Sequence, residues 1–237
     1  KPALAAFNAA LRLNPKMALA HAGRSRLWRA KGDHALALED IDTALAVGEA
    51  KPLYLYLRAE ALFDLGRHDP ALADLSTALR LNKEFYAGYG LLGANLAAKG
   101  DYKRARAAYN KALALNPGYS YANLGRAALR LAEGDEQGAF AELDEAVKVA
   151  GGDYASLYNR AEAYWNRGNK DNAVADYRRA LSAPDLPAAF AIKIGDRLAL
   201  LTLWREAISA YTSACELAPE AVEALIRRAQ AYESIKD

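Results

Sequence analysis

The chain of 237 residues is 53% hydrophobic and 25% charged, a composition typical of folded and not of disordered protein. A net charge of +2 gives no electrostatic reason to expect nucleic acid or an anionic membrane as the main partner. One cysteine and three histidines exclude a disulfide framework and leave little material for a metal site, so we expect no cofactor. No apolar run reaches about 18 residues, so we expect no membrane span.

Four series of residues recur every 34 positions along the chain, which indicates an internal repeat. The clearest series consists of alanine alone: Ala3, Ala37, Ala71, Ala105, Ala139, Ala173 and Ala207. The other three carry alanine, a large apolar residue and a small residue. Four unbroken series at one period are not expected by chance, even in an alanine-rich chain.

The period divides the chain into full repeats and two half repeats: 1–17, 18–51, 52–85, 86–119, 120–153, 154–187, 188–221 and 222–237. Apolar residues at i, i+3, i+4 and i+7 predict two helices in each full repeat. The half repeat at 1–17 should supply a second helix, and the one at 222–237 a first helix. A glycine separates the two helices in every full repeat except the last, which has Thr202, and glycine favours the left-handed conformation that ends a helix. Because the chain opens at Lys1 and Pro2 inside a predicted helix, we expect a fragment of a longer protein.

Residues 86–119 read YAGYGLLGANLAAKGDYKRARAAYNKALALNPGY and resemble the tetratricopeptide repeat (TPR) motif. The matching positions are Tyr89, Leu92, Gly93, Leu96, Gly100, Asp101, Tyr102, Ala105, Tyr109, Ala112 and Pro117. The period of 34 is specific, since HEAT and armadillo repeats need about 40 or more residues. The resemblance covers the whole chain and implies an all-α, right-handed TPR superhelix, an α-solenoid forming a single domain over 1–237. The compact repeats, rich in alanine and arginine, favour a bacterial origin.

A pattern of arginine and acid distinguishes four repeats from the other two. The expected pairs are Arg24 with Asp40, Arg58 with Asp74, Arg126 with Glu142, and Arg160 with Asp176. Repeats 86–119 and 188–221 lack both partners, with Leu92 and Ala108 in the first and Ile194 and Ala210 in the second. Because acid and arginine occur together, we expect a salt bridge between the two helices of one repeat, which favours specific pairing more than net stability. Two independent surface charges are the alternative.

The family resemblance implies that first helices line a concave groove, whose exposed stripe can be read from the repeat. The expected groove residues are Tyr56, Leu57, Glu60, Phe63, Gly90, Leu91, Ala94, Tyr121, Leu124, Tyr158, Asn159, Glu162, Trp165, Lys193 and Asp196. They form an apolar floor between two clusters that each contain aromatic residues and a glutamate, and glycines in the floor would admit a partner backbone. We expect a peptide or helix with an apolar middle and a basic residue. The alternative is that the aromatic residues only pack beneath neighbouring helices.

These patterns favour a non-enzymatic scaffold that binds a peptide or helix of a protein partner. No pair of acids is spaced to hold a reacting group, and no phosphate-binding loop is present. Some TPR proteins hold a carboxylate with lysine and asparagine, but here only Asn159 and Lys193 match, and only partly. Two alternatives stay open: the recruiting or regulatory arm of a larger enzyme or of a secretion or assembly protein, and a homo-oligomer that stacks through its end repeats. The compartment, cytoplasm or periplasm, also stays open.

Overall fold

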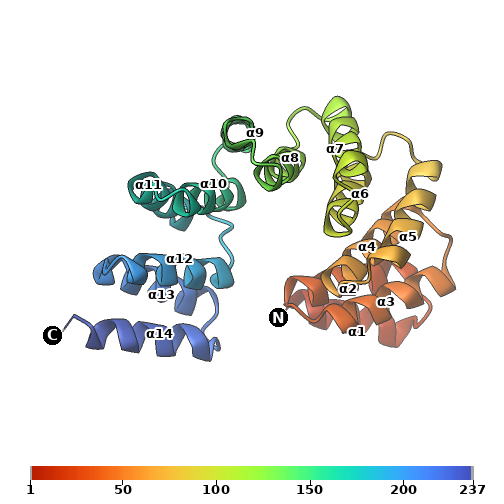
Figure 1. The fold of residues 1–237 in the computed structure, drawn as a ribbon. Coiled ribbons are helices and arrows are strands. Elements are labelled where there is room, and N and C mark those ends of the chain that lie inside the picture. The colour runs from red at the N-terminus through yellow and green to blue at the C-terminus, as the bar shows by residue number, and fades with distance from the viewer. Residues whose placement is uncertain (1, 236–237) are drawn as a thin grey trace. The chain divides into compact units, whose positions relative to one another are not determined.

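The computed structural model describes residues 2–235, which form fourteen helices and no strand (Figure 1). The helices are α1 (Pro2–Leu13), α2 (Ala18–Ala30), α3 (His34–Val47), α4 (Pro52–Asp64), α5 (His68–Leu81), α6 (Tyr86–Ala98), α7 (Tyr102–Leu115), α8 (Ser120–Ala132), α9 (Glu136–Val149), α10 (Tyr154–Asn166), α11 (Lys170–Leu181), α12 (Ala188–Leu200), α13 (Trp204–Leu217) and α14 (Val222–Glu233). The all-α fold expected from the sequence is therefore confirmed. Even-numbered helices are the first helices of the repeats, and odd-numbered helices are the second ones.

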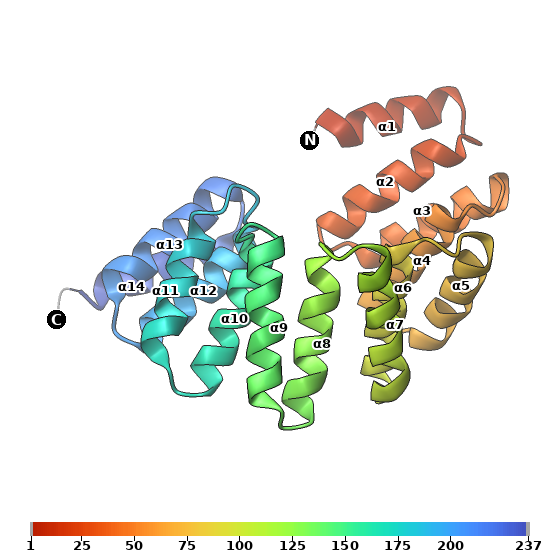
Figure 2. The same cartoon turned by 90° about the horizontal axis from the view of Figure 1, so that it is seen from above.

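The chain divides into two compact units, an N-terminal unit of residues 1–133 and a C-terminal unit of residues 134–237. Within each unit, successive helices run antiparallel and lie side by side (Figure 2). The boundary falls in the turn between α8 and α9, inside repeat 120–153, where Asn123 and Arg130 depart from the apolar pattern of the other repeats. The single continuous domain over 1–237 stays a prediction.

The recurring alanines allow the two helices of a repeat to approach closely. Ala37, Ala71 and Ala105 are fully buried on second helices, each four residues before the large apolar residue of its helix. That large residue, such as Leu75, fills the space left between helices, and its burial stabilises the fold by about 2 kcal/mol.

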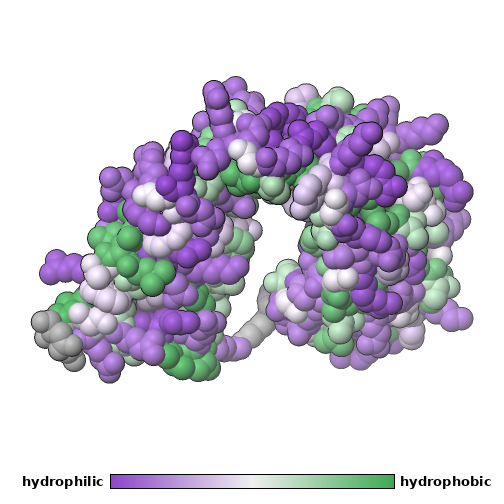
Figure 3. All heavy atoms as spheres, viewed as in Figure 1, coloured by the Kyte–Doolittle hydropathy of each residue, from purple (hydrophilic) through white to green (hydrophobic). Residues whose placement is uncertain are grey.

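Hydrophilic side chains cover most of the face seen in Figure 3, with apolar residues in smaller patches.

The turn between the two helices of a repeat combines a glycine with a capping residue. The five glycines at this position have φ between +70° and +85°, in the left-handed region: Gly32, Gly66, Gly100, Gly134 and Gly168. Thr202 takes their place in the last full repeat and is forced to a φ of +58°. After Gly100, Asp101 accepts a hydrogen bond from the backbone amide of Arg104 at 3.1 Å and caps α7.

Candidate functional site

An ion pair joins the two helices of a repeat in three of the four expected places. The pairs are Arg24 with Asp40, Arg58 with Asp74, and Arg160 with Asp176. Each is a two-pronged fork in which Nε and Nη2 of the guanidinium donate to both carboxylate oxygens, with N–O distances of 2.6–2.8 Å. The aspartates are only 4–6% exposed, so the acidic partner of each pair is buried between the two helices.

The third nitrogen of each arginine, Nη1, reaches back to the second helix of the preceding repeat. The acceptors are Asn8 for Arg24 at 2.8 Å, Asp42 for Arg58 at 3.2 Å, and Asp144 for Arg160 at 2.8 Å. We call this arrangement of one arginine, the aspartate of its own repeat and the acceptor of the preceding repeat the arginine clamp. The three acceptors occupy the same repeat position, so the 34-residue period contained a signal that our sequence interpretation missed.

Charge at the first clamp favours the ionised aspartate. Burial alone would raise the pKa of Asp40, but hydrogen bonds from Arg24 and His21 outweigh it and lower the pKa. The two ring nitrogens of His21 lie 3.0 Å from Asp40 Oδ1 and 2.9 Å from the carbonyl oxygen of Pro15. The fourth expected pair, Arg126 with Glu142, involves α8 and α9, which belong to different units, and it stays a prediction.

Aromatic rings form a row on the first-helix face of the N-terminal unit. This tyrosine row consists of Tyr56, Phe85, Tyr86, Tyr119 and Tyr121. Ring centroids are 5.1 Å apart for Tyr56 and Phe85, 5.0 Å for Tyr86 and Tyr119, and 5.7 Å for Tyr119 and Tyr121. Tyr86 and Tyr121 keep 38% and 40% of their surface exposed. The sequence interpretation named Tyr56 and Tyr121 but missed the other three, which stand at the last and first positions of repeats.

A charged group lies beside the tyrosine row. Arg29 on α2 contacts Glu60 and Asp64 on α4, with N–O distances of 3.0 and 2.6 Å. The hydroxyl of Tyr56 donates to Glu60 at 3.0 Å. Burial raises the pKa of Glu60, and the nearby Arg29 offsets this only in part. Burial together with the Glu60 charge raises the pKa of Tyr121 to about 12.

Three of the expected groove residues, Leu57, Leu91 and Gly90, are buried and do not line a groove. Leu57 and Leu91 are only 5% and 4% exposed, and both pack against the large apolar residue of the preceding second helix, Ile41 and Leu75. In these two repeats, the position therefore faces the core of the stack and not a partner.

Gly90 is also buried and does not offer its backbone to a partner. A Cβ there would lie 2.6 Å from the ring of Tyr119, so the glycine makes room for the tyrosine row. Gly125 on α8 makes room for Tyr109 in the same way, since a Cβ there would lie 2.2 Å from the tyrosine ring. The remaining floor residues Ala94 and Leu124 are half-buried, and Phe63 packs edge-on against His68 at 5.5 Å.

Glu162 in the C-terminal unit is held by two neighbours. Arg197 donates to both of its carboxylate oxygens at 2.9 and 2.6 Å, and the hydroxyl of Tyr177 donates to one of them. Burial works to raise the pKa of Glu162, but these hydrogen bonds outweigh it and lower the pKa. Arg197 also lies 4.9 Å from the ring centroid of Trp165, which Lys170 approaches to 3.7 Å from the other helix of the repeat.

A second aromatic group lies at the junction of α10 and α12. The rings of Tyr158 and Phe190 meet edge to face at 5.0 Å, and Lys193 lies 5.0 Å from the Phe190 ring. Asn159 is exposed but donates its amide to the carbonyl of Ala155 at 2.8 Å. The expected residues of this unit therefore form two small groups, of which Phe190 and Arg197 were missed.

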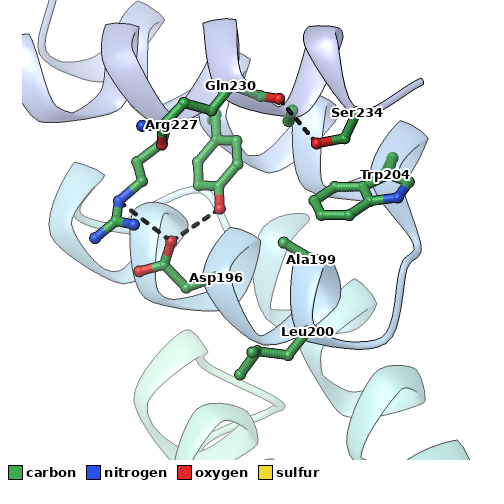
Figure 4. A pocket seen from close by; sticks show the side chains of 9 residues that line it. Asp196, Ala199, Leu200, Trp204, Arg227, Gln230 and Ser234 are labelled. Carbon is green, nitrogen blue, oxygen red and sulfur yellow. Dashed lines mark hydrogen bonds and ion pairs between the residues drawn. The ribbon is translucent and has the colours of Figure 1, made fainter. Parts of the chain in front are cut away.

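Asp196 belongs to a pocket of about 420 Å³ between α12, α13 and α14 (Figure 4). Its carboxylate accepts from the hydroxyl of Tyr211 at 2.8 Å and lies 3.6 Å from Nε of Arg227. Trp204 and Ser234 line the other end of the pocket. Asp196 is thus committed to contacts within its own unit.

Comparison with known families assigns the repeats. One family model of the tetratricopeptide repeat matches residues 3–54, 29–84, 56–120 and 91–153, and a second model with the same description matches 154–184. The chain belongs to the tetratricopeptide repeat family. Proteins of this family are in general scaffolds for protein–protein interaction.

A curated relative that contains TPR repeats is similar to part of the chain. The small glutamine-rich tetratricopeptide repeat-containing protein 2 of Mycosarcoma maydis is 31% identical over 96 residues, which are 40% of this chain and 27% of that protein. The chain thus corresponds to about a quarter of the length of this curated relative. The bacterial origin expected for the present chain stays a prediction.

Solved TPR structures share the fold at low sequence identity. Yeast Tom70 gives a TM-score of 0.75 at 18% identity, over 99% of this chain and 51% of that one. A tetratricopeptide repeat protein from Parabacteroides merdae gives 0.66 at 21% identity, over 97% and 91%. The APC/C hetero-tetramer Cut9-Hcn1 gives 0.67 at 16% identity, over 95% and 45%.

Among residues 2–235, no helix combines the length and apolar character needed to cross a membrane. Within the same range, no three histidine, cysteine, aspartate or glutamate side chains come together in a way that could hold a metal ion.

Proposed function

We propose that the chain is a non-enzymatic scaffold that binds a peptide or helix of a protein partner on its first-helix face, with the tyrosine row as the main anchor. The observation that supports this most is the row itself: two groups of packed rings from neighbouring repeats, in which Tyr86 and Tyr121 are each more than a third exposed. Tyrosine offers a large contact area and a polar end, and aromatic residues dominate the binding energy of interfaces.

The partner should contribute apolar side chains more than a basic one. Glu60 already contacts Arg29, which it shares with Asp64, and Glu162 is paired with Arg197. A partner cation at either place would have to displace an arginine held within hydrogen-bond distance. In the C-terminal unit, taken by itself, we propose that Tyr158, Trp165 and the exposed Asn159 and Lys193 form a separate contact surface of that unit.

A matched pair of tyrosines tests the proposal. Tyr121 on α8 and Tyr102 on α7 are both 40% exposed, but only Tyr121 belongs to the row. Peptides selected from a random displayed library against the chain should include a class that binds Tyr121→Ser about tenfold more weakly than wild type, as expected for loss of an aromatic anchor. Tyr102→Ser should leave that class unaffected. Equal effects of the two substitutions on every selected peptide would reject the row as the binding face.

Self-association is the second candidate, because α14 carries an exposed apolar face. Its members are Val222, Leu225, Ile226 and Tyr232, each 42–65% exposed. A contiguous apolar face of this kind favours contact with another protein surface, which could be a second copy of the chain. Sedimentation over a range of concentrations should then show a dimer or larger species that Ile226→Glu abolishes. A monomer at all concentrations would reject this candidate. A role as the arm of a larger enzyme stays a prediction.

A further inference from the structure

A hollow of about 730 Å³ lies in the N-terminal unit between α5, α6 and α7, on the side of the second helices. Its floor is apolar and consists mainly of Leu72, Leu79, Tyr89, Leu92 and Leu96. The tyrosine row lies on the first-helix face, so the hollow is a separate feature of this unit.

The hollow exists because repeat 86–119 lacks the arginine clamp. One repeat earlier, the equivalent place is filled by Arg58, Asp74 and Asp42, and the space left there is about 230 Å³. Leu92, Ala108 and Ser76 occupy the three equivalent positions in the hollow. Shorter side chains replace the whole clamp, and nothing else from the described residues takes up the volume.

The other repeat without an arginine clamp, 188–221, has a different ion pair between its second helix and the preceding one. Ile194 and Ala210 replace the clamp pair there, but Arg178 on α11 donates to Glu206 on α13 with N–O distances of 2.8 and 2.7 Å. The positions that correspond to Arg178 and Glu206 carry Ser76 and Arg104 in the hollow, and these cannot form an ion pair. The hollow is therefore a place that has neither the arginine clamp nor an ion pair like that of Arg178 and Glu206.

The rim of the hollow is cationic. Arg80, Lys83, Arg104 and Lys111 line it, and no aspartate or glutamate does. Arg104 is held by Asp101 at 2.6 Å, but the other three form no ion pair with any residue between 2 and 235. Three uncompensated cations around an apolar floor are complementary to a ligand that carries carboxylates on both sides of an apolar group.

We propose that this hollow is a second binding site, which takes an acidic peptide segment of a protein partner. One large apolar side chain of the segment enters the space vacated by the clamp and contacts Leu92 and Leu96. Flanking aspartates or glutamates pair with Arg80 and Lys83 at α5 and with Lys111 at α7. A peptide fits better than a compact anion because the hollow is an open trough, with Arg80 and Lys83 on one side and Lys111 on the other.

The chain itself supplies the variant that closes the site. The triple substitution Ser76→Asp, Leu92→Arg, Ala108→Asp installs the clamp of the neighbouring repeat, which is known to suit this fold. Peptides of 12 residues selected against the intact chain should include a class with several acids and one large apolar residue, whose binding weakens at least about tenfold in the triple variant. The double variant Lys83→Glu, Lys111→Glu should weaken the same class by about tenfold at low salt, since charged contacts at a rim are screened by salt. The matched control Arg12→Glu, Lys16→Glu, which changes the net charge equally on α1 and its following turn, should leave binding unchanged.

The outcomes separate this site from the first-helix face. Binding of the acidic class should survive Tyr121→Ser, so loss of the tyrosine site would leave this proposal standing. The surface double variant keeps the test valid if the triple variant fails to fold, as judged by circular dichroism. The proposal is overturned if no selected peptide weakens in the hollow variants, or if the affected peptides lack acids. It is equally overturned if single-stranded DNA or phosphatidylserine vesicles, and no peptide, depend on the same residues.

Discussion

Removal of Asp74 tests whether the arginine clamp holds repeats together. Asp74→Ala leaves Arg58, whose side chain is 31% exposed, with only the exposed Asp42 at 3.2 Å. Breaking a buried pair from one side costs about 3–5 kcal/mol, and because the guanidinium can turn partly to water we expect about 2–3 kcal/mol. Arg58→Leu should be the costlier single substitution, since it leaves a carboxylate that is only 6% exposed without its main partner.

The double substitution Arg58→Leu, Asp74→Ala should be much milder than either single one. It copies Leu92 and Ala108 of repeat 86–119 and leaves no unpaired charge. Replacing a buried pair by apolar residues is often close to neutral, so we expect the double variant to lie within about 1 kcal/mol of wild type. The coupling energy of the cycle should then be about 3 kcal/mol or more.

Urea unfolding followed by far-ultraviolet circular dichroism measures these differences, with the slope checked for constancy because repeat arrays can unfold in more than one step. Glu206→Ala is the matched control. Arg178 and Glu206 form the same fork, but their side chains are 58% and 34% exposed, so we expect a cost below about 1 kcal/mol. A double variant as unstable as the worse single variant would refute the clamp as a coupled unit.

Two further predictions concern the turn and the two glutamates. Thr202→Gly should stabilise the chain by about 1 kcal/mol in thermal unfolding, because a threonine at a φ of +58° is strained, whereas Gly100→Ala should destabilise it by a similar amount. The lowered pKa of Glu162 means that its ionised form stabilises the fold above its ordinary value of 4.5 and that this contribution is lost as the pH falls through the lowered pKa. Glu162→Gln should therefore be destabilising at pH 7 and converge with wild type in acid. The pKa of Glu60 is raised, so its ionisation opposes folding at pH 7, and Glu60→Gln should be no less stable than wild type there. The same sign for both glutamine variants at pH 7 would contradict this account.

The repeat period was enough to predict most of the fold, because a helix pair that cannot bury its own apolar face must stack in register against the next pair. The period also predicted the arginine–aspartate pairs, because the two repeats that lack the arginine also lack the acid. Both inferences need only the spacing along the chain, and neither needs the packing between repeats.

The orientation of the first helices could not be read in the same way. Leu57 and Leu91 occupy the same repeat position as Asn159 and Lys193, yet the leucines are buried and the other two are exposed. Whether that position faces the core depends on the rotation of a helix against the preceding repeat, which spacing alone does not fix. The tyrosine row was incomplete for a related reason, because Phe85 and Tyr119 stand in the connection before a helix, where periodicity gives no facing direction.

Loss of the arginine clamp in repeat 86–119 has a consequence beyond stability. In the clamped repeats, the volume between successive second helices is largely occupied by charges that satisfy one another, and at Arg58 only about 230 Å³ is left. Once Leu92 and Ala108 replace the pair, the same volume becomes apolar and open, while Arg80, Lys83 and Lys111 around it keep their charge. If replacing the pair is close to neutral for folding, as the double variant is expected to show, a repeat protein can exchange an internal contact for a binding site at little cost in stability. The stability of the double variant thus bears directly on why one repeat departs from its neighbours.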